Sequence, residues 1–127
     1  MLKDKFIKEE KRLINSFKYA INGFFVAFKS EKNMVIHTFA SLLVIILGLI
    51  LNISLIEWCI CLIMIAIVIS AELINTSIET VTDMITLKED RNAKRAKDVA
   101  ACSVFVLAFI SAIIGLIIFG PKLLALI

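Results

Sequence analysis

The 127-residue chain has little proline, glycine or histidine: it contains one Pro, four Gly and one His. So few Pro and Gly exclude collagen-like sequences, proline-rich linkers and turn-dense all-β folds. Charged residues make up only 20% of the chain and hydrophobic residues 61%, which excludes a chain that is disordered for want of apolar residues. The mean hydropathy of +0.99 indicates that much of the surface faces lipid. We therefore expect a small, mostly helical membrane protein.

Several motifs of soluble enzymes are also missing. The four glycines never cluster, and no G-x-x-x-x-G-K-[ST] loop for phosphates occurs. No Ser-His-Asp set or C-x-x-C pair is present, which argues against a hydrolase or a redox enzyme. The net charge of +3 is too small and dispersed to indicate a nucleic-acid partner. Cysteines 59, 61 and 102 all lie in apolar runs, where we expect them to act as small apolar fillers.

Two long gaps between charges predict membrane spans. No formal charge occurs in the 24 residues between Lys32 and Glu57, or in the 23 between Asp98 and Lys122. Each gap exceeds the roughly 20 residues that a helix needs to cross the hydrocarbon. A third apolar run begins at Ile56, with Asn52-Ile53-Ser54 as the expected turn before it. The sequence thus predicts three transmembrane helices, at about 35–53, 56–80 and 99–119.

The positive charges predict the orientation of these spans. Eight Lys or Arg residues precede the first span, none lies in the first connection, five lie in the second, and one is in the tail. By the positive-inside rule, the N-terminus and the second connection are expected in the cytoplasm. We expect a multi-pass protein of the cell membrane.

An amphipathic helix is predicted before the first span, within residues 1–32. One apolar stripe recurs at helical spacing, with lysines beside it: Phe6, Leu13, Phe17, Ala20, Phe24 and Phe28. A basic amphipathic helix of this kind typically lies in the headgroup layer. A soluble helix packed on the protein itself is the alternative. Arg12, Ser16 and Tyr19 share its polar flank, and these residues by themselves indicate only a solvated surface.

The most informative segment is a polar stripe near the end of the second span. Glu72, Asn75, Glu79 and Asp83 are spaced 3, 4 and 4 residues apart, so they share one helix face. An acidic residue at the bilayer centre costs about 2.5–3.5 kcal/mol even on translocon scales. The stripe should therefore face other helices, a cavity or the cytoplasmic mouth. Solvation at the helix end remains an alternative for Glu79 and Asp83.

Other charges are expected at the same level of the membrane. Glu31 flanks the first span and could be an ordinary helix-end charge. Paired with Glu79, it could supply the one or two carboxylates that Mg²⁺ usually takes from a protein. Lys97 and Asp98, at the start of the third span, should lie close to the stripe.

The pattern E-L-I-N-T-S-I-E-x-x-x-D at 72–83, followed by A-K-D at 96–98, resembles the prokaryotic diacylglycerol kinase family, which includes undecaprenol kinases. The resemblance runs from Arg12 through the third span. Residues 22–37, which contain A-F-K-S-E-K-N-M-x-I-H, are similar to the Gram-positive branch. Val35 and Cys102 depart from that branch, where a basic residue and a glycine are common, and both changes could affect lipid contacts or helix packing.

The resemblance implies a homotrimer whose active sites are shared between subunits at the cytoplasmic interface. It also implies ATP and Mg²⁺, with phosphoryl transfer to a lipid hydroxyl. Glu72 matches the catalytic base, and Glu31 and Glu79 match the metal-binding carboxylates that also face the nucleotide. The remaining matches lie around the nucleotide and phosphates: Arg12, Tyr19, Asn75, Lys97 and Asp98. Phosphoryl transfer consists mostly of positioning and charge neutralisation, so we expect direct in-line transfer without a phospho-enzyme.

Three alternatives remain open at this point. The lipid could be undecaprenol or diacylglycerol, and residues 22–37 alone favour undecaprenol. A small proton-coupled transporter would explain an intramembrane Glu72 but would leave Glu79, Asp83 and Lys97 without a role. A non-catalytic relative of the family ranks last, because every expected functional position is filled.

Overall fold

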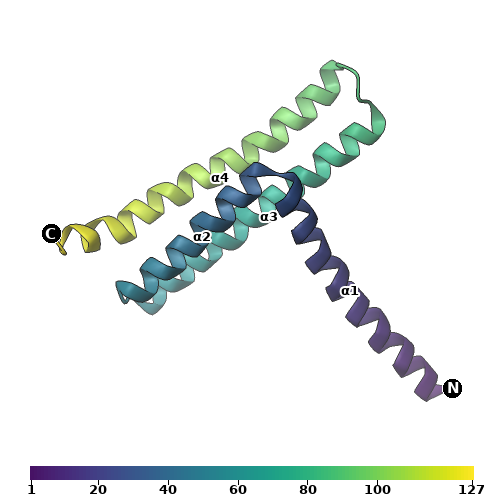
Figure 1. Ribbon diagram of the computed structural model, residues 1–127, viewed down its shortest axis with the longest axis horizontal. Helices are drawn as coiled ribbons and strands as arrows, with labels where there is room; N and C mark the ends of the chain where they lie inside the picture. The colour runs from purple at the N-terminus through teal and green to yellow at the C-terminus, as the bar shows by residue number, and fades with distance from the viewer.

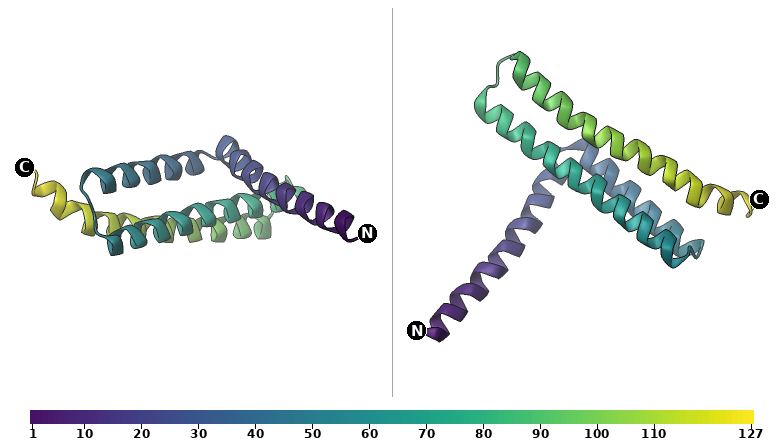
Figure 2. Two further views of the ribbon diagram at one scale, coloured as in Figure 1. Left: turned by 90° about the horizontal axis from the view of Figure 1, so that it is seen from below. Right: turned by 180° about the vertical axis from the view of Figure 1, so that it is seen from behind.

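The computed structural model describes residues 1–127 as four helices joined by short connections (Figure 1). Their bounds are α1 Leu2–Ser30, α2 Lys32–Ile50, α3 Leu55–Ile85 and α4 Arg91–Leu124. Helices α2, α3 and α4 run alongside one another, and α3 packs against both of the others, most extensively against α4. Helix α1 leaves this bundle at a wide angle (Figures 1 and 2). The expected all-helical class is confirmed.

Three of these helices are long and apolar enough to cross a membrane, namely α2, α3 and α4. This confirms the number of spans expected from the charge gaps. Only 14 of the 127 residues are buried, and most large apolar side chains on the three spans point outward. An apolar exterior around a small core suits a chain that is surrounded by lipid.

The connection between α2 and α3 is the tight turn expected around Asn52. Asn52 adopts a left-handed conformation with φ 49°, which Asn tolerates better than most residues. Ser54 caps α3 by accepting a hydrogen bond from the Glu57 backbone N–H at 3.2 Å. Behind the turn, a Cβ at Gly48 would lie 2.7 Å from the ring of Trp58. Glycine at this position therefore permits the close approach of α2 and α3.

The connection between α3 and α4 is shorter than the charges suggested. Much of the charged segment 88–98 is helical, and α4 begins at Arg91, eight residues before the predicted span. Asp90 explains the early start, because its carboxylate accepts hydrogen bonds from the Asn92 and Ala93 backbone N–H groups at 2.9 Å each. At its other end α4 continues past Pro121, and Lys122 there forms a 3.1 Å ion pair with Glu57 of α3.

Helix α1 ends where the backbone of Glu31 becomes extended, with φ −117° and ψ 119°. Ala27 is the only buried residue on α1. The helix therefore does not pack on the protein along its length, and this part of the sequence-based alternative is wrong. Its apolar stripe is exposed from Phe6 to Ala20 and half-buried at Phe24 and Phe28, and an exposed apolar stripe is what a helix lying in the headgroup layer requires.

Candidate active site

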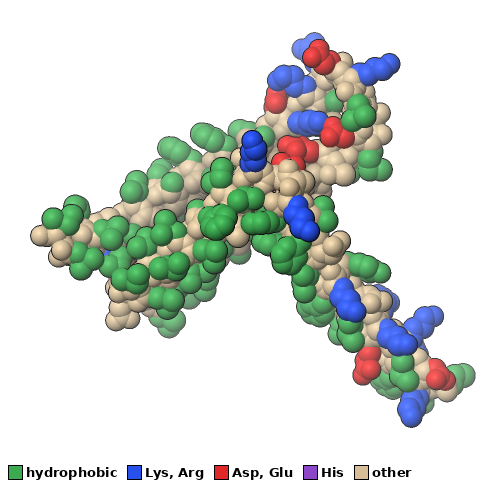
Figure 3. Space-filling model, viewed as in Figure 1, with side chains coloured by type: hydrophobic (Ala, Val, Ile, Leu, Met, Phe, Trp, Pro, Cys, Tyr) green, Lys and Arg blue, Asp and Glu red, His purple; other side chains and the backbone are tan.

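The polar stripe of α3 faces into the bundle, as its spacing predicted. Glu72 is only 1% exposed and Asn75 only 4% exposed. Glu79, one turn further along, is half-buried, and Asp83 is exposed beyond it. The stripe thus passes from the bundle interior to the charged end of the α3–α4 hairpin, where acidic and basic side chains gather (Figure 3). Solvation at the helix end was the alternative for Glu79 and Asp83, and of these two residues only Asp83 is exposed.

Glu72 is buried without a partner. Neither of its carboxylate oxygens has a hydrogen bond, and Oδ1 of Asn75 is also unpartnered. The Nδ2 group of Asn75 donates to Oε1 of Glu79 at 3.3 Å. Buried polar atoms without partners are costly and uncommon, and they frequently mark a site that a ligand completes.

Glu31 brings a further carboxylate to this stripe, from the corner between α1 and α2. Partial burial raises the pKa of Glu31, and the negative charge of Glu79 raises it further. Glu72 also lies within electrostatic range of Glu31 and Glu79. Three carboxylates that repel one another create a site that favours a cation or a proton.

The donor set suits magnesium better than a transition metal. No group of three or more His, Cys, Asp or Glu side chains is arranged to enclose a metal ion. Mg²⁺ needs no such cage, because it takes one or two carboxylates and completes its octahedron with water and phosphate oxygens. Glu31 and Glu79 are the two carboxylates that could supply such ligands, and Asn75 donates a hydrogen bond to Glu79.

The hairpin between α3 and α4 places one cation, Lys97, beside the stripe. Nζ of Lys97 lies 2.5 Å from Oδ1 of Asp83, and Lys94 pairs with Asp98 one turn along α4. Lys97 also lies within electrostatic range of Glu79. The sequence correctly predicted Lys97 near the stripe and left the role of Asp83 open. Asp98, which was expected there too, pairs with Lys94 of its own helix and with no residue of the stripe. Asp83 and Lys97 lie on either side of the hairpin connection and carry opposite charges. These opposite charges are the signal in the sequence that could have predicted their ion pair.

Arg12 and Tyr19 are not brought to this site by their own chain. Tyr19 is 73% exposed, and Arg12 has no ion pair. Along α1, Tyr19 lies about 12 Å and Arg12 about 22 Å from Ala27, the one residue of the helix that is buried. The reason is the direction of α1, the helix on which both residues lie, because it leads away from the bundle (Figure 1).

The fold and the site together define a class of protein: an integral membrane enzyme of three spans, with carboxylates and an ammonium group at one end of its bundle. The chain belongs to the prokaryotic diacylglycerol kinase family, whose pattern it matches over residues 18–119. The sequence-based resemblance is therefore confirmed, and the chain is a membrane lipid kinase.

Individual relatives cover most of the chain. It is 44% identical over 115 residues to the undecaprenol kinase of Bacillus subtilis (strain 168), which covers 91% of this chain and 94% of that protein. It is 35% identical over 115 residues to a diacylglycerol kinase of Synechocystis sp., covering 90% of this chain and 66% of the relative. A diacylglycerol kinase of Haemophilus influenzae is 35% identical over 94 residues, covering 74% of this chain and 80% of the relative.

Proposed function

We propose that this protein transfers the γ-phosphoryl group of ATP to the primary hydroxyl of undecaprenol. The choice of lipid is supported by the 44% identity to an undecaprenol kinase over nearly the full length of both chains. The family membership makes the transporter alternative unnecessary, because lipid phosphorylation gives a role to the whole carboxylate and lysine cluster.

The observation that carries the mechanism is the buried, unpartnered carboxylate of Glu72. Its two free oxygens can accept the proton of a lipid hydroxyl. As the proton passes to Glu72, the hydroxyl oxygen forms a bond to the γ-phosphorus, and the bond from that phosphorus to the bridging oxygen of ADP breaks. No group in the site is needed as a covalent phosphate carrier, so transfer is direct and in line.

The remaining residues position the nucleotide. Glu31 and Glu79 would hold Mg²⁺, which when bound neutralises phosphate charge. Lys97, held by Asp83, would offset the charge that develops on the phosphates. Asn75, which bonds Glu79, and Asp98, which pairs with Lys94, would lie beside the nucleotide.

Arg12 and Tyr19 reach the nucleotide from a neighbouring subunit of a homotrimer, in our proposal. This assignment is supported by the direction of α1, which carries both residues away from their own bundle.

The site lies on the cytoplasmic side of the cell membrane in this proposal. The eight Lys and Arg residues before α2 and the five that follow α3 support it, because positive charges next to spans are retained in the cytoplasm. ATP is then supplied on the same side.

The proposal is tested by phosphorylation of undecaprenol by the purified protein in mixed micelles, with Glu72→Gln and a magnesium-free sample beside it. We expect activity in the wild type and its loss in both of the others. Glu57→Gln is the matched control, because Glu57 is an acidic residue of the same helix at the opposite end and should leave activity near wild type. A folded wild-type protein without activity on any lipid alcohol would contradict the proposal.

Diacylglycerol is the second candidate substrate, because two of the relatives are diacylglycerol kinases. It also presents a primary hydroxyl at the membrane interface. Side-by-side kcat/KM values for the two lipids decide between them, and a higher value for diacylglycerol would reverse our assignment.

A further inference from the structure

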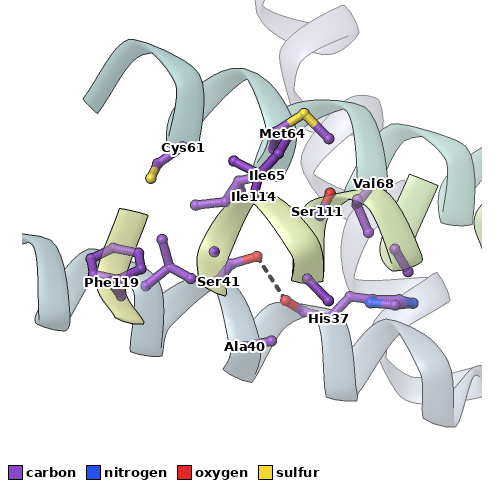
Figure 4. Close-up of a pocket in the computed structure, with 14 residues that line it drawn as sticks. His37, Ala40, Ser41, Cys61, Met64, Ile65, Val68, Ser111, Ile114 and Phe119 are labelled. Carbon is purple, nitrogen blue, oxygen red and sulfur yellow. Dashed lines mark hydrogen bonds between the residues drawn. The ribbon is translucent and has the colours of Figure 1, made fainter. Parts of the chain in front are cut away.

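An apolar cavity of about 230 Å³ lies between α2, α3 and α4. His37 and Val68 lie at one end of it, and Cys61 and Phe119 lie at the other (Figure 4). Its lining is mostly hydrophobic, and one of its few polar atoms, Oγ of Ser111, is buried without a hydrogen-bond partner. Nothing in the phosphoryl-transfer site described above uses this space.

The cavity is aligned with Glu72. Cys61, Ile65 and Val68 line it from α3, and together with Glu72 they follow at steps of four, three and four residues. They therefore share one helix face. Val68 lies about 6 Å and Cys61 about 16 Å along the axis from Glu72. The cavity thus begins about one helical turn beyond the carboxylate and continues on the same face toward the opposite end of the bundle.

The far end of the cavity is closed, and one side is not. Cys61 and Phe119 belong to the compact apolar cluster that also contains Ile53 and Ile118, against which Trp58 packs. In contrast, α2 and α4 both pack on α3 and hardly contact each other. A chain that enters from the Glu72 end can therefore leave between α2 and α4 into the surrounding lipid.

We propose that this cavity binds the first isoprene units of the lipid alcohol whose hydroxyl lies at Glu72; the inference rests on the proposed function. An extended hydrocarbon advances roughly 1.2 Å per bond, so the span from 6 to 16 Å corresponds to about the fifth to the thirteenth carbon. A cavity of about 150 Å³ holds benzene, so 230 Å³ accommodates about nine carbons. With its two methyl branches this stretch holds about eleven carbons, so the two estimates agree to within about two carbons. The rest of the chain extends into the bilayer.

The test compares a fifteen-carbon isoprenoid alcohol, which reaches the cavity, with a five-carbon allylic alcohol, which does not. Ala112 lines the cavity, and Ala112→Leu fills part of it. We expect kcat/KM for the longer alcohol to fall by at least about ten-fold, in the range that pocket methylenes produce, with little change for the shorter alcohol. Val106→Phe is the matched control, because Val106 is exposed on the same helix outside the cavity. It should leave both values unchanged.

Equal losses on both alcohols, or no loss on either, would overturn the proposal. If the wild type phosphorylated neither of these short alcohols, its activity on undecaprenol would still decide the proposed function, and occupancy of the cavity would be decided by binding without catalysis. For that purpose a diazirine is placed near the tenth carbon of the longer alcohol, and the protein is photolabelled in the absence of ATP. We expect label in peptides 61–68 and 108–119, reduced by excess undecaprenol and by Ala112→Leu. Label confined to other peptides contradicts the proposal.

A second copy of the chain is the other occupant that this test can reveal. Cross-linking and light scattering report the oligomeric state of Ala112→Leu beside that of the wild type. An unchanged state together with the loss of cavity labelling supports the lipid chain as occupant. A changed state in Ala112→Leu, together with an unlabelled cavity in the wild type, would show that the cavity is an interface between copies.

Discussion

At the scale of single residues, the site is dominated by charges that the fold does not neutralise. Glu72 is buried with both oxygens unpaired, and Glu31 and Glu79 lie near enough to repel it. Natural proteins tend to keep such costly arrangements at functional sites, where a ligand or a transferred proton relieves them. Substitutions in this cluster should therefore separate activity from stability.

Replacement of Glu72 by Gln is expected to lower kcat by about 10²–10⁴, the usual contribution of a general base. The same change should leave the thermal midpoint equal or higher, because it removes a buried group that can carry charge. The measurement is kinase activity beside thermal unfolding in detergent. A midpoint several degrees lower would show that Glu72 has a structural partner.

The carboxyl group of Glu31 should titrate above its ordinary value of 4.5. Because its pKa is raised in the folded state, the fold favours the protonated form, and ionisation as the pH rises through this pKa destabilises the fold. In Glu79→Gln the pKa of Glu31 should fall but remain above 4.5, since burial is the larger cause. Carboxyl ¹³C NMR of both proteins measures this, and an identical pKa in the two would contradict it.

At the scale of elements, the packing of α2 against α3 depends on the close approach of Gly48 to Trp58. A Cβ at Gly48 would meet two ring carbons of Trp58 and one methyl of Ile53 within 3.1 Å. The aromatic ring is rigid and belongs to the packing at the closed end of the bundle. This end holds α2 against α3 and so bounds the cavity.

Gly48→Ala is therefore expected to destabilise the protein by about 1–3 kcal/mol, the usual cost of overpacking. Gly115→Ala is the control, because a Cβ there meets nothing within 4 Å and helix interiors favour alanine by about 0.5–1 kcal/mol. Unfolding in a graded denaturing detergent measures both. Equal effects of the two substitutions would show that the Trp58 contact imposes no constraint.

At the scale of the whole molecule, one chain holds only part of the proposed site. Its own α3 supplies Glu72 and Glu79, α4 supplies Lys97, and Glu31 lies between α1 and α2. In contrast, α1 extends away from the bundle (Figure 1), and its Arg12 and Tyr19 are exposed. If α1 of one subunit serves the site of the next, two differently inactivated chains should complement each other in mixed oligomers.

We expect Arg12→Ala and Glu72→Gln to be nearly inactive alone and to recover activity when co-assembled. With random mixing in equal amounts, about a quarter of the sites in a cyclic oligomer would combine an intact α1 with an intact α3. Activity of the mixture, corrected for each parent, measures this fraction. No recovery in mixed oligomers verified by tag pull-down would show that each site uses one chain only.

The sequence by itself determined the class of fold, the number of spans and the polar face of α3. These follow from apolar runs and from a helical period, which are local properties of the chain. It also predicted Glu72, Asn75 and Glu79 as site residues, because a carboxylate stripe in an apolar helix has few structural uses. The early start of α4 at Arg91 was missed, since a charged segment resembles a loop until its Asp90 cap is recognised.

Only the tertiary structure decided which charged residues pair across helices and where a cavity forms. The pairing of Asp83 with Lys97, the ion pair between Glu57 and Lys122, and the cavity beside Val68 all depend on how α3 packs on its neighbours. Residues far apart in sequence carry no periodic signal of such contacts. The packing of α3 against its neighbours therefore decides the ion pairs and the cavity, and the direction of α1 decides where Arg12 and Tyr19 lie.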